Sequence, residues 1–366
     1  MLFILLLAAV GIILAGWAVL RQEKFGRLPA GARLERIQSS PNYQDGEFRN
    51  TVPTIMLAEG QSSIKIMGDF LFGTRTRLKP DEPLPTVRLE LDALDPAKDM
   101  LIWLGHSSYF IQLGGKRILV DPVFNDHGAP LAVFNKNFPG TDLYRAADMP
   151  PLDFLLISHD HWDHLDYSTA VGLREKVKTV ITPLGVGAHF EYWGYPKEKL
   201  KEADWNTALR FENELLIHIV PARHFSGRLL TRNKTGWAGF VLETPTLRLF
   251  LSGDSGYGPH LAEIARTFGR FDLVAIDGGQ YDARWPQMHM TPEEAALAAK
   301  ELKAEAFLLS HVGRFCISSH QWDDPFRRVV EAAKDKPFRL LTPKIGEPVW
   351  LDGTEQSFTR WWEGLK

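Results

Sequence analysis

The hexapeptide His159-Asp160-His161-Trp162-Asp163-His164 constrains this chain more than any other segment. It directly follows the apolar run Phe154–Ile157, which has the length and composition of a buried strand. Only 12 histidines occur in 366 residues, and three of them stand in these six positions, so a solvent-facing loop explains the cluster poorly. Residues two apart in an extended segment point to the same side, so we expect His159, His161 and Asp163 to converge. The hexapeptide therefore predicts a metal site at the end of a strand.

Further candidate ligands stand at the ends of other apolar runs. We expect His164 to turn in beside Asp163 where the next helix begins. His224 follows the run Leu215–Val220, Asp254 follows Leu247–Leu251, and His311 follows Ala306–Leu309. In α/β proteins, sites gather at the carboxyl ends of strands, so these side chains are expected to join the hexapeptide. The single cysteine excludes an intrachain disulfide and any cysteine-based zinc site, which leaves His and carboxylate as the metal ligands.

Short apolar runs punctuated by Gly, Asp and Pro continue through residues 96–366, which we expect to form the main domain. Ten such runs predict strands: 101–104, 109–113, 117–120, 154–157, 179–182, 215–220, 237–242, 247–251, 273–276 and 306–309. The clearest helix start is Thr291-Pro292-Glu293-Glu294, in which Thr291 caps, Pro292 fills the first turn and Glu294 completes a capping box. This order of strands and helices predicts a layered α/β architecture with mixed sheets.

The N-terminal segment differs from the rest. Leu2 to Leu20 form nineteen consecutive uncharged, mostly apolar residues, which as a helix would span the roughly 30 Å hydrocarbon layer of a bilayer. We predict a transmembrane anchor over residues 1–20, with a cleaved signal segment as the alternative. Basic residues follow the run and none precede it, which favours a cytoplasmic location of the main domain over a periplasmic or extracytoplasmic one. Residues 21–95, rich in Pro, Gly and polar residues, are expected to form an extended arm.

The charge balance argues against a nucleic-acid partner. The chain carries 42 basic and 45 acidic residues, for a formal net charge of −3. Phosphate-backbone binding needs a clear positive excess, which is missing here. The sequence leaves the oligomeric state open.

The hexapeptide matches the His-x-His-x-Asp-His motif of the metallo-β-lactamase superfamily, which the chain resembles over roughly residues 95–350. More specifically, the chain is similar to the N-acyl-phosphatidylethanolamine-hydrolysing phospholipase D branch in segments 103–106, 119–122, 157–159, 253–257, 271–276, 281–285 and 292–295. The resemblance implies a four-layer αββα sandwich. It also implies that His159, His161 and His224 hold one metal, that Asp163, His164 and His311 hold the second, and that Asp254 bridges them.

Such a ligand set suits two Zn²⁺ ions, with Mn²⁺ or Fe as alternatives. Two metals can activate a shared hydroxide for in-line attack at phosphorus, and Asp163 is the expected catalytic residue because it can steer that hydroxide. Asp121 ends the run 117–120 and is expected to accept a hydrogen bond from a ligating imidazole. His320 and Arg284 are the candidate substrate contacts, Arg284 because a guanidinium binds phosphate bidentately.

These features together predict a metal-dependent phosphodiester hydrolase that cleaves a membrane N-acyl-phosphatidylethanolamine or a related glycerophospholipid in the manner of a phospholipase D. Two alternatives remain open. One is a hydrolase of the same fold that acts on a soluble lactone or cyclic phosphodiester. The other is a non-hydrolytic diiron or metal-binding membrane protein. Residues 277–280 and Arg223 depart from the phospholipase D pattern near the expected site, so the sequence leaves the substrate open.

Overall fold

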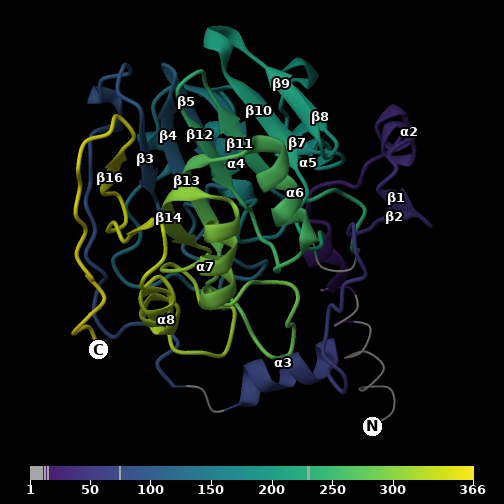
Figure 1. Cartoon of the computed structure of the whole chain (residues 1–366). Coiled ribbons are helices and arrows are strands. Elements are labelled where there is room, and N and C mark those ends of the chain that lie inside the picture. The colour runs from purple at the N-terminus through teal and green to yellow at the C-terminus, as the bar shows by residue number, and fades with distance from the viewer. Residues whose placement is uncertain (1–10, 12–13, 15, 74–75, 229–230) are drawn as a thin grey trace.

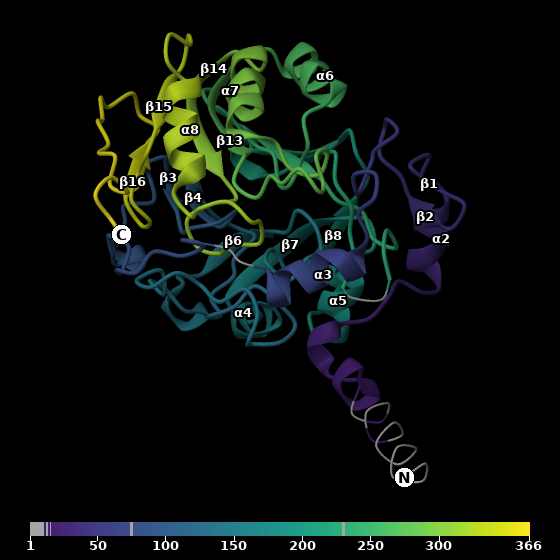
Figure 2. The same cartoon turned by 90° about the horizontal axis from the view of Figure 1, so that it is seen from below.

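The computed structural model describes residues 11, 14, 16–73, 76–228 and 231–366. Two sheets of seven strands each carry the fold (Figure 1). The first sheet has the order β16-β3-β4-β5-β6-β7-β8, and the second has the order β15-β14-β13-β12-β11-β10-β9. Figure 2 shows helices α4 and α5 outside the first sheet and α6, α7 and α8 outside the second. The chain therefore has the layered α/β architecture that the sequence predicted.

The strands of the first sheet are β3 (Met100–Trp103), β4 (Tyr109–Leu113), β5 (Lys116–Val120), β6 (Leu152–Leu156), β7 (Val177–Pro183), β8 (Leu200–Ala203) and β16 (Pro348–Trp350). Those of the second are β9 (Thr207–Arg210), β10 (Leu216–Val220), β11 (Gly239–Glu243), β12 (Arg248–Leu251), β13 (Phe271–Asp277), β14 (Ala304–Ser310) and β15 (Arg339–Leu341). Each of the ten predicted runs overlaps one of these strands. The prediction missed β8, β9, β15 and β16, which are short and less apolar.

Both sheets are mixed. In the first, β16, β3, β4 and β5 pair antiparallel, whereas β5, β6, β7 and β8 run parallel. In the second, β9 to β12 pair antiparallel and β12 to β15 run parallel. Parallel neighbours end at the same edge of a sheet, so residues that follow β5 and β6, or β12, β13 and β14, are brought close together.

The α-helices are α2 (Ala32–Gln38), α3 (Ser63–Phe72), α4 (Tyr167–Leu173), α5 (Gly187–Tyr192), α6 (Pro259–Phe268), α7 (Pro292–Glu301) and α8 (Asp324–Ala332). Helix α7 begins as predicted: the Thr291 side chain accepts from the Glu294 N–H, and the Glu294 carboxylate accepts from the Thr291 N–H. The helix buries small side chains, Ala295 and Ala299 among them, which lets it approach β13 and β14 closely.

The N-terminal arm, residues 21–95, contains α2, α3 and the hairpin of β1 (Tyr43–Gln44) and β2 (Glu47–Phe48). Its residues Ile37, Phe48 and Leu84 are buried in the hydrophobic core. The predicted anchor, residues 1–20, lies largely outside the described residues, because positions 1–10, 12–13 and 15 are not described. Within the described part of the chain, no helix has both the length and the apolar character needed to cross a bilayer.

Candidate metal centre

The predicted ligands stand on loops that leave the carboxyl ends of strands from both sheets. The loop 159–164 follows β6, His224 follows β10, Asp254 follows β12 and His311 follows β14. Backbone hydrogen bonds tie the loops to neighbouring strands, such as that from Ala238 N–H to the Ser158 carbonyl at 2.9 Å. The structure thus brings all seven predicted metal ligands to the place where the two sheets meet.

One group of potential ligands consists of His159, His161, His224 and Asp254, whose ligand atoms all lie within 4.8 Å of one another. Nδ1 of His161 lies 2.8 Å from Nε2 of His159 and 3.2 Å from Nε2 of His224. Oδ2 of Asp254 lies 3.7 Å from His159 Nε2 and 3.6 Å from His224 Nε2. Three imidazole nitrogens and a carboxylate oxygen therefore face one point.

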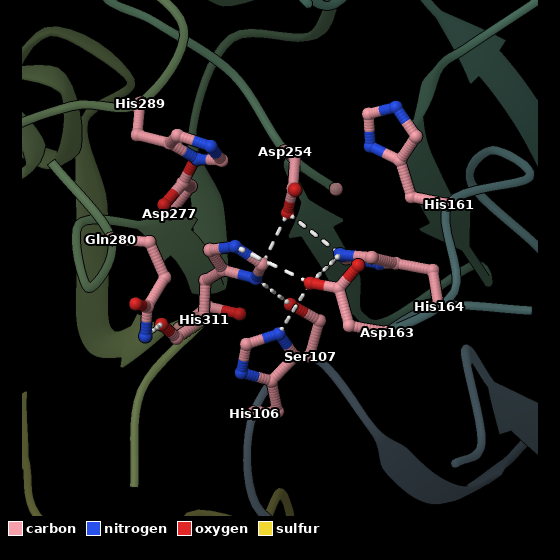
Figure 3. Close-up of polar contacts among 12 residues, drawn as sticks. His106, Ser107, His161, Asp163, His164, Asp254, Asp277, Gln280, His289 and His311 are labelled. Carbon is pink, nitrogen blue, oxygen red and sulfur yellow. Dashed lines mark hydrogen bonds and ion pairs between the residues drawn. The ribbon is translucent and has the colours of Figure 1, made fainter. Parts of the chain in front are cut away.

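A second group consists of His106, Asp163, His164 and His311, again within 4.8 Å. Oδ2 of Asp163 lies 2.9 Å from His106 Nε2, 3.6 Å from His164 Nε2 and 3.9 Å from His311 Nε2. Figure 3 shows Asp254 above this group, with Oδ1 3.0 Å from His164 Nε2 and 3.1 Å from His311 Nδ1. Asp254 thus directs one oxygen toward each group, which is the arrangement of a bridging carboxylate.

The protonation of these groups suits metal binding. Burial lowers the pKa of His159, His224 and His311 well below the usual value, and neighbouring imidazoles lower it further. Burial also lowers the pKa of His161 to about 4. These imidazoles are therefore neutral at physiological pH, which is the form that binds a metal.

Two buried atoms at the junction of the groups, His164 Nε2 and Asp254 Oδ1, lie 3.0 Å apart, and neither has a hydrogen-bond partner among the residues that the structure describes. Burial opposes charging His164, but the Asp254 and Asp163 carboxylates raise its pKa well above the usual value. Burial raises the pKa of Asp254 to about 6. A buried polar atom without a partner is costly, and a divalent cation would satisfy both atoms. The residues present therefore fit a dinuclear metal centre.

Asp121 lies beside the ligands. Its Oδ2 accepts a hydrogen bond from His164 Nδ1 at 2.9 Å, which leaves Nε2 of that ring for a metal. The same carboxylate accepts from the N–H of Ser158 at 2.7 Å and from its hydroxyl at 2.5 Å. Asp121 therefore sets the orientation of His164 and anchors the start of the 159–164 loop.

A cavity of about 250 Å³ opens onto both groups. His161, Asp163, His224, Asp254, His289 and His311 form its polar part. Apolar side chains form the rest of the wall: Met56, Leu57, Phe225, Trp285, Met288 and Ile317. Arg232 is the basic side chain of the lining. A substrate in this cavity would contact the metal ligands on one side and apolar side chains on the other.

Comparison with known proteins agrees with this geometry. Residues 116–312 match the sequence profile of the Beta-lactamase superfamily domain. The chain belongs to the metallo-β-lactamase superfamily. It is 34% identical over 329 residues to the uncharacterized protein Rv0906 of Mycobacterium tuberculosis, with 89% of this chain and 88% of that protein covered. As a metallo-β-lactamase superfamily member with two groups of His and Asp ligands, it is a metal-dependent hydrolase.

Two further relatives are informative about family and fold. N-acyl-phosphatidylethanolamine-hydrolyzing phospholipase D 1 of Caenorhabditis elegans is 27% identical over 352 residues, which cover 85% of this chain and 97% of that protein. The crystal structure of an isothiocyanate hydrolase from Delia radicum gut bacteria aligns with a TM-score of 0.54 at 17% identity. The alignment covers 68% of this chain and 98% of that one. At this identity, the structural likeness concerns the metallo-β-lactamase fold alone.

The structure does not bring the two predicted substrate contacts into the cavity lining. Both ring nitrogens of His320 lie near backbone carbonyls, Nε2 2.9 Å from Gly279 O and Nδ1 2.8 Å from Gln321 O. Arg284 forms an ion pair with Asp282 at 2.6 Å and lies 3.8 Å from Asp69. Neither side chain belongs to the cavity lining, although the Arg284 guanidinium lies over the ring of Trp285, which does line the cavity.

Sequence reasoning did not select three residues that the structure places at the centre: His106, His289 and Arg232. His289 donates from Nδ1 to Asp277 Oδ2 at 2.8 Å, and its ring stacks on His311 with centroids 4.9 Å apart (Figure 3). His106 follows a strand and His289 precedes the capped helix α7, but a lone histidine at such a place carries little signal. For Arg232, no sequence signal distinguishes it from the other arginines.

Proposed function

We propose that this chain hydrolyses a phosphodiester of a glycerophospholipid, releasing the head-group alcohol and phosphatidate, with an N-acyl-phosphatidylethanolamine as the substrate. The observation that carries the proposal is the composition of the cavity, in which a dinuclear metal site and an arginine face an apolar wall. A phosphodiester would bind at the metal side and an acyl or glyceryl chain along Met56, Leu57 and Trp285. The likeness to the phospholipase D of C. elegans supports this substrate class.

Charge favours an anionic substrate. Two divalent ions with the carboxylates of Asp163 and Asp254 leave a formal charge of +2 before a water molecule is deprotonated. Arg232, which also lines the cavity, adds a further positive charge that no ion pair within the described part of the chain neutralises. Its guanidinium lies over the Phe225 ring, 5.6 Å from the ring centroid. A guanidinium at this position can bind phosphate oxygens bidentately. We propose zinc as the metal, since imidazole and carboxylate ligands suit it.

Two bound metal ions would supply a water molecule of lowered pKa and polarise the phosphoryl group. Asp163, whose Oδ2 is held by His106 Nε2 at 2.9 Å, orients the attacking water. The water loses a proton to the solvent, and its oxygen forms a new bond to phosphorus while the bond from phosphorus to the head-group oxygen breaks. His289 lines the cavity, and its Nδ1 donates to Asp277. In the doubly protonated ring, Nε2 is therefore the nitrogen that gives the leaving oxygen its proton.

We also propose that the chain works at a membrane, with its catalytic domain on the cytoplasmic side. The apolar run 2–20 and the basic residues after it support this location. Helix α3, at the lower edge of the molecule in Figure 1, exposes the apolar side chains of Ile64 (86% exposed) and Met67 (55% exposed). The helix follows Met56 and Leu57 of the cavity wall in the chain, so a lipid surface against α3 would lie near the cavity entrance.

The proposal is tested by product analysis in H₂¹⁸O. The detergent-solubilised full chain, loaded with zinc, is given mixed micelles of N-acyl-phosphatidylethanolamine and, separately, a cyclic phosphodiester and an acyl-homoserine lactone. We expect phosphatidate that carries one ¹⁸O and an N-acylethanolamine that carries none, because water attacks phosphorus. Turnover of the soluble compounds alone would replace this proposal by the soluble-substrate alternative.

A further inference from the structure

A segment of the N-terminal arm, residues 48–58, contributes Met56 and Leu57 to the cavity wall. Two of its backbone N–H groups donate to loops that also contribute to the cavity wall: Phe48 donates to Asn233 O at 2.8 Å, and Ala58 donates to Arg284 O at 2.8 Å. Near the middle, Ile55 N–H donates to Gln287 Oε1 at 2.7 Å. The segment therefore joins the loop after β10 to the loop before α7, and these two loops carry His224 and His289.

Within this segment, the Asn50 side chain is hydrogen bonded to both backbone groups of the expected metal ligand His224. Its Oδ1 accepts from His224 N–H at 3.0 Å, and its Nδ2 donates to His224 O at 2.8 Å. Oδ1 also lies 3.2 Å from Nε1 of Trp237, which donates to Ala222 O at 3.0 Å. A single amide side chain thus pairs with both backbone groups of His224, as a neighbouring strand would.

His224 needs such support because it lies beyond the end of β10. Strand β10 ends at Val220 and β11 begins at Gly239, so no pairing between the described strands holds the backbone of His224. The other fixed point of the residue is its ring, whose Nδ1 donates to Met288 O at 3.1 Å and leaves Nε2 toward the metal group. With backbone and ring both held, the position of Nε2 is determined before a metal binds.

We propose that Asn50 is a positioning residue for the metal ligand His224, which makes the N-terminal arm a functional part of the metal centre. The inference rests on the metal centre and not on the phospholipid substrate. Partners that orient a metal ligand contribute about 10–100-fold to metal affinity. Loss of Asn50 therefore weakens the binding of the metal at His159, His161 and His224. It leaves the binding of the metal at Asp163, His164 and His311 unchanged.

The test compares Asn50→Leu and Asn50→Asp with the control Asn42→Leu in the full-length chain. Leucine has a similar size and removes both hydrogen bonds, whereas aspartate keeps the acceptor and loses the donor to His224 O. Asn42 belongs to the same arm and donates from Nδ2 to Asp204 Oδ1 at 3.0 Å, away from the cavity. Both metal dissociation constants are measured by competition with a chromophoric chelator, and the cobalt(II)-loaded proteins are compared by absorption spectroscopy.

We expect Asn50→Leu to raise the dissociation constant of one of the two metal ions about 10–100-fold and to change the cobalt spectrum. Asn50→Asp should have a smaller effect, and Asn42→Leu should have none. If Asn50→Leu does not fold, Asn50→Asp alone decides by the same two readouts. Two unchanged dissociation constants, or equal losses at both sites, would overturn the inference. No substrate is present, so this result is independent of the phospholipase proposal.

Discussion

At the scale of single residues, Asp254 connects the two groups of ligands. Its Oδ2 faces His159 and His224, and its Oδ1 faces His164 and His311. An amide in its place keeps the shape but removes the negative charge that two cations share. Loss of a residue that only orients a metal ligand can cost about 100-fold in activity. We expect Asp254→Asn to lower kcat by more than this, and to reduce bound zinc below two per chain.

Activity and zinc content of Asp254→Asn are measured together, with Glu305→Gln as the control. Glu305 is a carboxylate at the opposite end of β14 from His311, paired with Arg270 at 2.7 Å on the surface. The control should retain both zinc ions and full activity. Full activity of the Asp254→Asn protein with one metal or none would exclude a bridging role.

His289 is proposed to give the leaving oxygen its proton, and the dependence of kcat on the leaving group tests this role. We expect His289→Gln to lower kcat about 10²–10⁴-fold for a phosphodiester with an aliphatic alcohol as leaving group. A nitrophenyl ester should be far less affected, because nitrophenolate leaves without a proton. The control is His320→Gln, which should change neither rate because His320 lies outside the cavity lining. Equal losses of His289→Gln on both substrates would assign His289 to metal binding instead.

At the scale of elements, α7 shows how a local signal stabilises the region around the site. The helix packs on β13 and β14 and begins three residues after His289. Thr291→Ala removes the side-chain acceptor for the Glu294 N–H and should lower the free energy of unfolding by about 1 kcal/mol. Urea unfolding measures the change. Thr267→Ala in α6, where the exposed hydroxyl donates to Glu263 O within the same helix, should have little effect.

At the scale of the whole molecule, the arm is held to the domain from residue 23 onward. Trp193 Nε1 donates to Glu23 O at 2.8 Å, and Arg228 donates to Lys24 O at 2.8 Å. We therefore expect removal of residues 1–20 to give a folded, zinc-loaded protein that no longer sediments with membranes. Removal of residues 1–27 should also lower the melting temperature. A full-length chain that stays in the supernatant of a membrane preparation would contradict the predicted anchor.

Metal removal tests the molecule as a unit. Because the metals join loops from both sheets and bind the folded chain, saturation at about 1,000 times the dissociation constant adds about 4 kcal/mol of stability per site. Dialysis against a chelator should therefore abolish hydrolysis and lower the melting temperature, and added zinc should restore both. Undiminished hydrolysis in fully metal-stripped protein would show that the reaction does not need the centre.

The sequence alone determined the features that depend on neighbours along the chain. Alternation in an extended segment places His159, His161 and Asp163 on one side, and the spacing of Thr291 and Glu294 sets the start of α7. The apolar runs indicated ten strands, and the residues at their ends included seven candidate ligands. These signals are local because backbone geometry relates residues a few positions apart.

Only the tertiary structure decided what depends on the order of strands and the course of loops. Asn50 lies 174 positions from His224, and His106 lies 57 positions from Asp163, yet both pairs are hydrogen bonded. Conversely, Arg284 and His320 are residue types that can contact a phosphate, but the structure places neither in the cavity lining. A side chain's residue type limits which interactions it can form. Its role depends on which distant segment the packed sheets place beside it, and no local pattern encodes that placement.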